Sequence, residues 1–203
     1  MADVSGSMHA QGKIKVLNES VRSMIRSFAA EDNVRGEIWV AVVTFGSGGA
    51  LLHQPLIPAV QTTWTDMRAD GGTPMGQAFD LVERLLHDES AIPERAYTST
   101  LVLVSDGKPT DEWQEPLERL VSSRRGAKSV RLAVGVGQEM DDEDFAVLTA
   151  FTGDAAKVVR AHEIDRLSSF FAWVTMSVTT QLRSGQPDTP PEMNADDVLG
   201  FMN

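Results

Sequence analysis

The stretch Asp3-Val4-Ser5-Gly6-Ser7 is a polar turn near the first residue, and an amphipathic segment follows it. Residues two apart in an extended turn project to the same side, so Asp3, Ser5 and Ser7 can all face one point. Gly6 allows the backbone to bend tightly between them. A polar turn that leads into a helix is typical of the edge of an open α/β sheet, where ligands bind.

Beyond this turn, helical and strand patterns alternate along the chain. Apolar residues at steps of three and four predict helices, and continuous apolar runs predict strands that are buried on both faces. The expected helices are 13–31, 75–86, 113–123, 143–151 and 164–182, and the expected strands are 37–45, 50–56, 98–104, 130–136 and 157–159. The alternation predicts a doubly wound, mostly parallel sheet with helices on both faces, as in Rossmann-like folds.

The composition indicates a soluble globular protein, since 42% of its 203 residues are hydrophobic and 23% are charged. We expect one domain over residues 1–184 and an acidic, proline-containing tail over 185–203. The absence of cysteine excludes a disulfide framework and thiol chemistry. A net charge of −11 argues against nucleic-acid and anionic-membrane partners. No apolar stretch reaches the roughly 18 residues of a membrane span, so we expect a cytoplasmic protein.

Two further polar clusters accompany the first turn. Gly71-Gly72-Thr73 precedes the helix expected at 75–86, and Asp106 ends the strand expected at 98–104. Loops from different strands converge beyond the carboxyl ends of a parallel sheet. Carboxylate and hydroxyl oxygens suit a hard cation in octahedral geometry. The sequence therefore predicts a site for magnesium or manganese made of Asp3, Ser5, Ser7, Thr73 and Asp106. The alternative is that Ser7 caps a helix and Asp106 makes a turn.

The charge of this expected site indicates what it would bind. Only Asp3 and Asp106 are carboxylates, whereas Ser5, Ser7 and Thr73 are neutral hydroxyls. A divalent ion held by such a set keeps most of its positive charge. Such an ion attracts an acidic oxygen from outside, so the expected partner is a protein that presents Asp or Glu to the metal.

These residues also resemble a known family. Asp3 to Met8, Thr73 and Val104-Ser105-Asp106-Gly107 look like the metal-ion-dependent adhesion site of von Willebrand factor A-type (VWA) domains. The resemblance covers about residues 3 to 180. It implies a protein-binding domain that captures its partner through a bridging magnesium ion.

A narrower resemblance rests on three other segments. Residues 71–76, 105–111 and 170–174 look like the small bacterial VWA proteins of the tellurite-resistance type. Members of that group are often encoded beside a serine/threonine kinase and a phosphatase. The resemblance thus implies a scaffold in a bacterial stress or signalling system, with a kinase or phosphatase as a possible partner.

Two other functions remain open. One is a magnesium-dependent phosphotransferase or hydrolase that uses Asp3 or Asp106 as nucleophile. Such a site needs a base and a cationic phosphate clamp, for which Lys108 is the one nearby candidate in the sequence, so we expect no enzyme. The other is a metal-independent structural subunit, whose partner binding a chelator would leave unchanged.

The sequence departs from the family at the first strand. VWA domains place an apolar strand directly before the first aspartate, whereas only Met1 and Ala2 precede Asp3 here. A missing central strand would leave backbone groups unpaired, each at a cost of about 1–3 kcal/mol. Either the flanking strands close up, another segment inserts, or water fills a groove. We expect the native gene product to carry an upstream apolar strand that ends at Asp3.

Overall fold

The computed structural model describes residues 1–31, 36–137, 140, 142–161 and 164–184. The described strands are β1 (Ala2–Asp3), β2 (Trp39–Gly46), β3 (Gly49–Pro58), β4 (Thr100–Ser105), β5 (Val130–Val136) and β6 (Val158–Ala161). The α-helices are α1 (Lys13–Ala29), α2 (Met75–His87), α3 (Gln114–Ser122), α4 (Asp142–Thr152) and α5 (Ile164–Ser184). Short 3-10 helices are η1 (Gly6–Gly12), η2 (Ala59–Gln61) and η3 (Ala155–Lys157).

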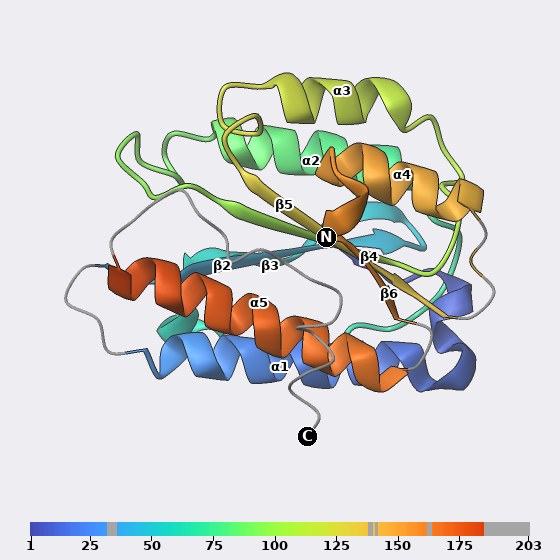
Figure 1. Ribbon diagram of the computed structural model, residues 1–203, viewed down its shortest axis with the longest axis horizontal. Helices are drawn as coiled ribbons and strands as arrows, with labels where there is room; N and C mark the ends of the chain where they lie inside the picture. Colours follow the sequence, from blue (N-terminus) through green and yellow to red (C-terminus); the bar gives the residue numbers. More distant parts are fainter. Residues whose placement is uncertain (32–35, 138–139, 141, 162–163, 185–203) are drawn as a thin grey trace.

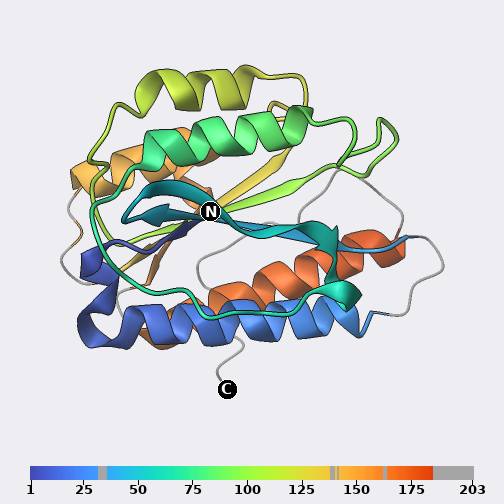
Figure 2. The ribbon, with the colours of Figure 1, turned by 180° about the vertical axis from the view of Figure 1, so that it is seen from behind.

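The described strands form one six-stranded sheet with the order β3-β2-β1-β4-β5-β6. Only the hairpin of β2 and β3 is antiparallel; the other neighbouring strands run parallel. Helices α1 and α5 cover one face, and α2, α3 and α4 cover the other (Figures 1 and 2). The predicted doubly wound α/β fold is therefore confirmed, and its tail over 185–203 lies outside the described residues.

Each face of the sheet has its own apolar core. On the α1 side, Leu17, Val21 and Ile25 recur at helical spacing and are buried with Phe170 and Trp173 of α5. On the other side, buried side chains of α2, α3 and α4 pack on β4 and β5, and the rings of Phe79 and Phe151 stack 5.9 Å apart. Strands β4 and β5 lie between these layers and are apolar along most of their length, as expected for parallel strands with helices on both faces.

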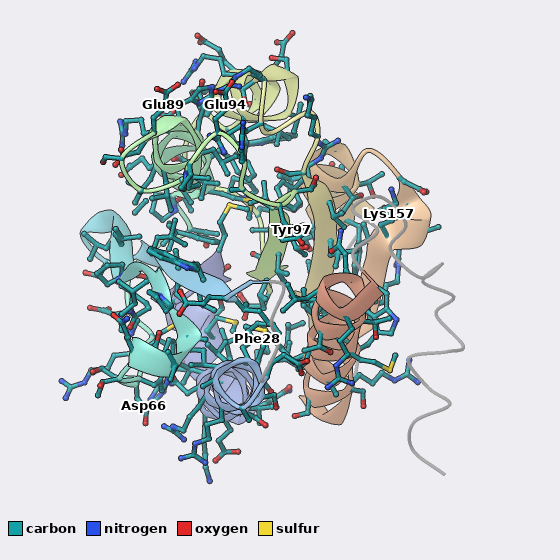
Figure 3. The ribbon with its side chains drawn as sticks, turned by 90° about the vertical axis from the view of Figure 1, so that its left-hand side faces the viewer. Phe28, Asp66, Glu89, Glu94, Tyr97 and Lys157 are labelled. Atoms are coloured by element: carbon teal, nitrogen blue, oxygen red, sulfur yellow. The ribbon has the colours of Figure 1, made fainter. Side chains whose placement is uncertain are left out.

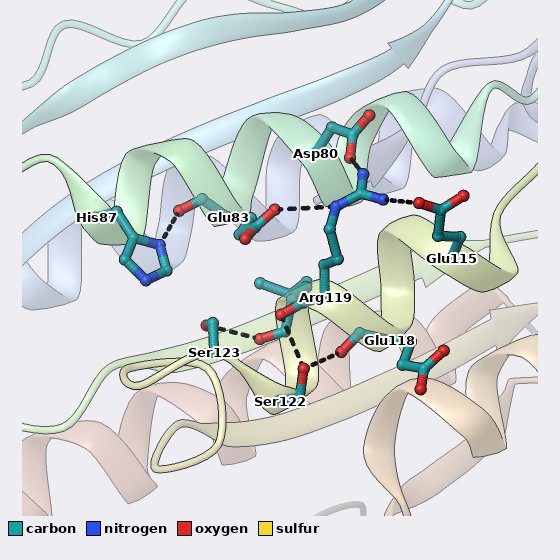
Figure 4. A network of polar contacts seen from close by, with 9 residues as sticks. Asp80, Glu83, His87, Glu115, Glu118, Arg119, Ser122 and Ser123 are labelled. Atoms are coloured by element: carbon teal, nitrogen blue, oxygen red, sulfur yellow. Dashed lines mark hydrogen bonds and ion pairs between the residues drawn. The ribbon is translucent and has the colours of Figure 1, made fainter.

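Helices α2 and α3 are also joined at the surface, around Arg119 (Figure 4). Its guanidinium contacts Asp80 and Glu83 of α2 and lies 2.8 Å from Glu115 of α3. Nearly half of the Arg119 side chain is exposed, so these ion pairs contribute little to the free energy of unfolding. Their effect is on the orientation of α3 relative to α2.

Strand β1 lies in the middle of the sheet although it has only two residues. Ala2 is opposite Thr44 of β2 on one side and Val104 of β4 on the other. The Met1 amino group donates a hydrogen bond to the Val102 carbonyl at 2.7 Å, and burial lowers the pKa of this amine to about 5. Asp3 thus stands at the carboxyl end of a central strand. Among the described strands, β2 and β4 do not pair with each other, and residues of both line a groove.

Candidate metal centre

Asp3 and Asp106 lie at the switch point of the sheet. Asp3 ends β1, and Asp106 directly follows β4, the parallel neighbour of β1. From β1 the chain continues into β2 on one side, whereas β4 lies on the other. A ligand of an open α/β sheet binds beyond the carboxyl ends of two such strands.

The Asp3 carboxylate is fully buried. Its Oδ1 accepts a hydrogen bond from the Ser5 backbone N–H at 2.8 Å, and its Oδ2 accepts one from the Ser105 hydroxyl at 2.6 Å. Burial raises the pKa of Asp3 to about 6, although the hydrogen bonds from Ser105 and Ser5 oppose this shift. Asp106 raises it further because the two carboxylates repel each other. A cation between them would relieve both costs.

The side chains of Ser5, Ser7 and Asp106 form a continuous chain of hydrogen bonds. The hydroxyls of Ser5 and Ser7 lie 2.9 Å apart, and Ser7 donates to Asp106 Oδ1 at 2.7 Å. Ser7 lies inside η1, and Gly12 precedes α1, so Ser7 does not cap that helix. The spacing that predicted a shared direction for Asp3, Ser5 and Ser7 thus brings them together with Asp106.

Thr73 reaches the same end of the sheet through backbone contacts. Gly6 N donates to Gly71 O at 2.9 Å, which ties the loop before α2 to the first turn. Thr73 N donates to the Thr110 hydroxyl at 3.0 Å, and Thr110 N donates back to Thr73 O at 2.9 Å. These backbone contacts position the buried Thr73. Among the described residues, Thr73 makes no hydrogen bond to Ser5, Ser7 or the two carboxylates.

Three contributors to this site are absent from the set predicted from the sequence. Lys13, the first residue of α1, donates to Asp106 Oδ2 at 2.8 Å. Ser105 holds Asp3, and Asp111 accepts hydrogen bonds from the first amides of α2. The sequence held a signal for Ser105 and Asp111, because Ser105 directly precedes Asp106 and Asp111 follows it five residues later. Lys108, the cation considered from the sequence, instead contacts Glu143 at 2.9 Å.

The donors gathered here fit a divalent metal ion. Two carboxylates and several hydroxyls from three loops lie at one edge, and these oxygens suit magnesium or manganese. Within the described part of the chain, no group of three or more His, Cys, Asp or Glu side chains could hold a metal ion. An ion at this edge would therefore depend on neutral hydroxyls as much as on carboxylates, and it would keep positive charge toward solvent.

The fold and this edge define a class of protein: Rossmann-like α/β domains with a polar, oxygen-lined site at the switch point. The sequence matches the von Willebrand factor type A domain over residues 1–108, slightly more than half of the chain. The chain belongs to the von Willebrand factor type A domain family. No curated protein matched it.

Solved structures of this fold include adhesion and matrix proteins. Proximal thread matrix protein 1 from the mussel byssus, with a zinc-occupied MIDAS motif, has a TM-score of 0.62 and 18% identity over 88% of this chain and 44% of its own. Manganese-loaded TRAP protein of Plasmodium vivax has a TM-score of 0.57 and 20% identity over 82% and 68%. The pilus adhesin SpaC from Lactobacillus rhamnosus GG has a TM-score of 0.72 and 14% identity over 89% and 29%.

The chain thus spans less than half of the mussel and Lactobacillus proteins. At these identities the likeness shows a shared fold. In the described residues, no helix has both the length and the hydropathy of a transmembrane span.

Proposed function

We propose that this chain is a metal-dependent protein-binding module that captures an Asp or Glu of a partner through a bound magnesium or manganese ion. The ion would be held by Asp3, Ser5, Ser7, Thr73 and Asp106. The observation that carries the proposal is the hydrogen-bonded chain from Ser5 through Ser7 to Asp106, beside the buried Asp3. It brings carboxylates and hydroxyls from distant parts of the sequence to one edge of the sheet.

The comparisons support a metal at this place in the fold. Two structural neighbours carry zinc or manganese, in one case in the MIDAS motif itself. When bound, the ion supplies a positive charge to which a carboxylate from outside can coordinate. The residues of this chain would orient the ion and leave it underneutralised, because only Asp3 and Asp106 oppose its charge.

The setting of this module is the finer part of the proposal. The residues that resemble tellurite-resistance-type VWA proteins suggest a cytoplasmic scaffold in a bacterial stress system, with a kinase or a phosphatase as partner. A binding role without enzymatic turnover fits the adhesion and matrix proteins among the neighbours. A screen for kinase and phosphatase activity with magnesium should therefore detect no turnover.

Thermal melts with magnesium or manganese, against a chelator, test the metal. An ion at about 100 times its Kd stabilises the folded state by about 2.7 kcal/mol, or roughly 5–10 °C for a domain of this size. Asp106→Ala and the milder Ser7→Ala should abolish the shift, whereas Glu94→Ala, which removes an exposed carboxylate, should retain it. Identical melts of the unmodified protein with metal and with chelator would disprove the metal site.

Peptides test the partner's chemistry. Manganese should make the protein bind short peptides that contain Asp or Glu, and the matched Asn and Gln peptides should not bind. A chelator should remove the binding. Equal binding of acidic and amide peptides, or binding that survives the chelator, would favour the metal-independent structural subunit instead.

A further inference from the structure

A small pocket lies at the β2–β3 hairpin, between the two strands and the segment 67–70, and has a volume of about 160 Å³. Its lining combines side chains of three kinds: one buried hydroxyl, two charged groups and several apolar groups. The volume is well below the about 300–1,000 Å³ of pockets for drug-sized ligands, so an occupant has to be small.

One wall of the pocket belongs to the segment 62–70, which runs along α1 from η2 toward α2 (Figure 2). The buried Asn18 of α1 holds this segment by both ends of its amide, because Nδ2 donates to Met67 O at 3.0 Å and Oδ1 accepts from Met67 N at 2.8 Å. Arg22 of α1 contacts Asp66, which is labelled in Figure 3. The wall is therefore fixed by α1, and the pocket is preformed.

The deepest polar group of the pocket is the hydroxyl of Thr44. Thr44 is 5% exposed and lies between Val43 and Phe45, which belong to the core on the other face, so its side chain points to the α1 side. Among the described residues, nothing forms a hydrogen bond with this hydroxyl, which opens on the pocket. A ligand that displaces solvent from Thr44 has to replace the hydrogen bond that water makes there.

Two opposite charges lie at the mouth of the pocket. Arg68 and Asp70 are two residues apart, both are exposed, and both line the pocket. Asp70 Oδ1 accepts from Gly71 N at 2.8 Å, but among the described residues neither Asp70 Oδ2 nor the Arg68 guanidinium has a hydrogen-bond or ion-pair partner. An anion alone would be repelled by Asp70 and a cation alone by Arg68, so the mouth favours a ligand that carries both charges.

The remaining walls determine the size and the end of the ligand's side chain. Val4, Leu51 and Met67 are apolar and stand between the charged mouth and Thr44. A guanidinium pairs with a carboxylate, and a carboxylate accepts from an ammonium group. An α-amino acid carries these two groups on one carbon atom, whereas a residue inside a peptide carries neither charge.

We propose that this pocket binds a free α-amino acid with a short hydroxyl side chain, serine or threonine. Arg68 binds the α-carboxylate and Asp70 the α-ammonium group. The side chain passes between Val4 and Leu51, and its hydroxyl pairs with that of Thr44. This binding is separate from the metal-dependent capture of a protein partner, and it does not require the metal ion.

Calorimetry of the full chain with L-threonine and L-serine tests the proposal, in a chelator so that the carboxylate cannot bind a metal ion. Both amino acids should bind saturably, with a Kd of about 1 mM or tighter for a ligand of this size. N-acetylthreonine and threonine amide each lack one charge and should bind at least about tenfold more weakly. No saturable binding of either amino acid, or equal binding of the two derivatives, would overturn the proposal.

Variants of the pocket test the three contacts separately. Arg68→Gln and Asp70→Asn should each weaken threonine binding at least about tenfold, and the asparagine retains an acceptor for Gly71 N. Arg84→Gln removes an exposed arginine of α2 outside the pocket and should leave the affinity unchanged.

Thr44→Val keeps the shape of the side chain and removes its hydroxyl. The melting temperature of the unliganded variant should stay the same, because this hydroxyl has no partner among the described residues. Threonine should bind the variant more weakly, whereas L-valine should bind it at least as tightly as it binds the original protein. An unchanged preference for threonine over valine would overturn the placement of the side chain, and unchanged affinity in both Arg68→Gln and Asp70→Asn would overturn the site.

Discussion

At the level of single residues, the contact between Lys13 and Asp106 has the largest consequence for the proposed metal site. The Asp106 side chain is fully buried and Lys13 is 13% exposed, with 2.8 Å between Nζ and Oδ2. A nearby positive charge stabilises a buried carboxylate. The ammonium group supplies this charge at the carboxylate that a divalent ion would also contact, so the two cations compete.

Lys13→Gln should therefore tighten metal binding and weaken the metal-free protein. Two unit charges about 4 Å apart interact by about 4 kcal/mol near a protein surface, so the loss of repulsion should raise manganese affinity at least about tenfold. The metal-free protein should lose about 1–3 kcal/mol, since Asp106 remains buried without its ion pair. Calorimetry and denaturant titration measure the two effects.

Lys15→Gln is the matched control for this prediction. Lys15 is 79% exposed and lies 4.0 Å from Glu19 on the same helix, so its loss should change neither quantity. A Lys13→Gln protein that binds manganese with unchanged affinity would show that Lys13 moves aside without cost. If neither protein binds manganese, the proposed metal site itself fails.

The residues of the proposed metal site could be predicted from the sequence, but most of the contacts between them could not. Asp3, Ser5 and Ser7 share a direction because they alternate along one turn, and Asp106 follows an apolar strand, so both patterns are local. Lys13 could not be assigned, because η1 and the left-handed Gln11 and Gly12 lie between it and the turn. The backbone conformation of these residues determines the direction of the Lys13 side chain, and no periodic pattern in the sequence predicts that conformation.

At the level of elements, the start of α2 depends on a loop from another part of the chain. Both oxygens of Asp111 accept from this helix, Oδ1 from Gly76 N and Oδ2 from Gln77 N, each at 3.0 Å. The amides at a helix start need such acceptors, and a negative charge there is favourable. Because Thr73 precedes this helix and bonds to Thr110, the same loop fixes its place at the site.

Asp111→Ala should lower the free energy of unfolding by about 1–2 kcal/mol, because it leaves these amides without their acceptor. It should also weaken manganese binding, since Thr73 becomes less fixed. Asp111→Asn retains one acceptor oxygen, so its free energy of unfolding and its manganese affinity should lie between those of the original protein and Asp111→Ala. Denaturant titration and calorimetry provide the measurements, and an Asp111→Ala protein as stable as the original would contradict the role of this cap.

Most elements were predictable because their patterns are long. The strand 130–136 was predicted with its observed bounds, and α1, α2 and α5 began where the apolar periodicity did. The short η1 was not predicted, since seven residues without an apolar stripe carry no periodic signal. β1 was identified as truncated rather than as a strand, because its two residues pair only through their neighbours in the fold.

At the level of the whole molecule, the two-residue β1 places Asp3 in the middle of the sheet, between β2 and β4. Its ladder is short, so the position of Asp3 relies on few hydrogen bonds on either side. Binding of a metal opposes any freedom that Asp3 has, so it should also order the short ladder of β1. The metal centre and the central strand are therefore coupled.

This coupling can be measured by hydrogen exchange. Because coupling between two sites is reciprocal, bound manganese should slow exchange of the amides that pair with β1, among them that of Val104, which donates to Met1 O at 3.0 Å. Asp106→Ala removes a ligand of the proposed metal site and should remove this slowing, whereas Glu94→Ala, which removes an exposed carboxylate, should retain it. Exchange that bound manganese leaves unchanged would mean that β1 holds Asp3 in place independently of the metal.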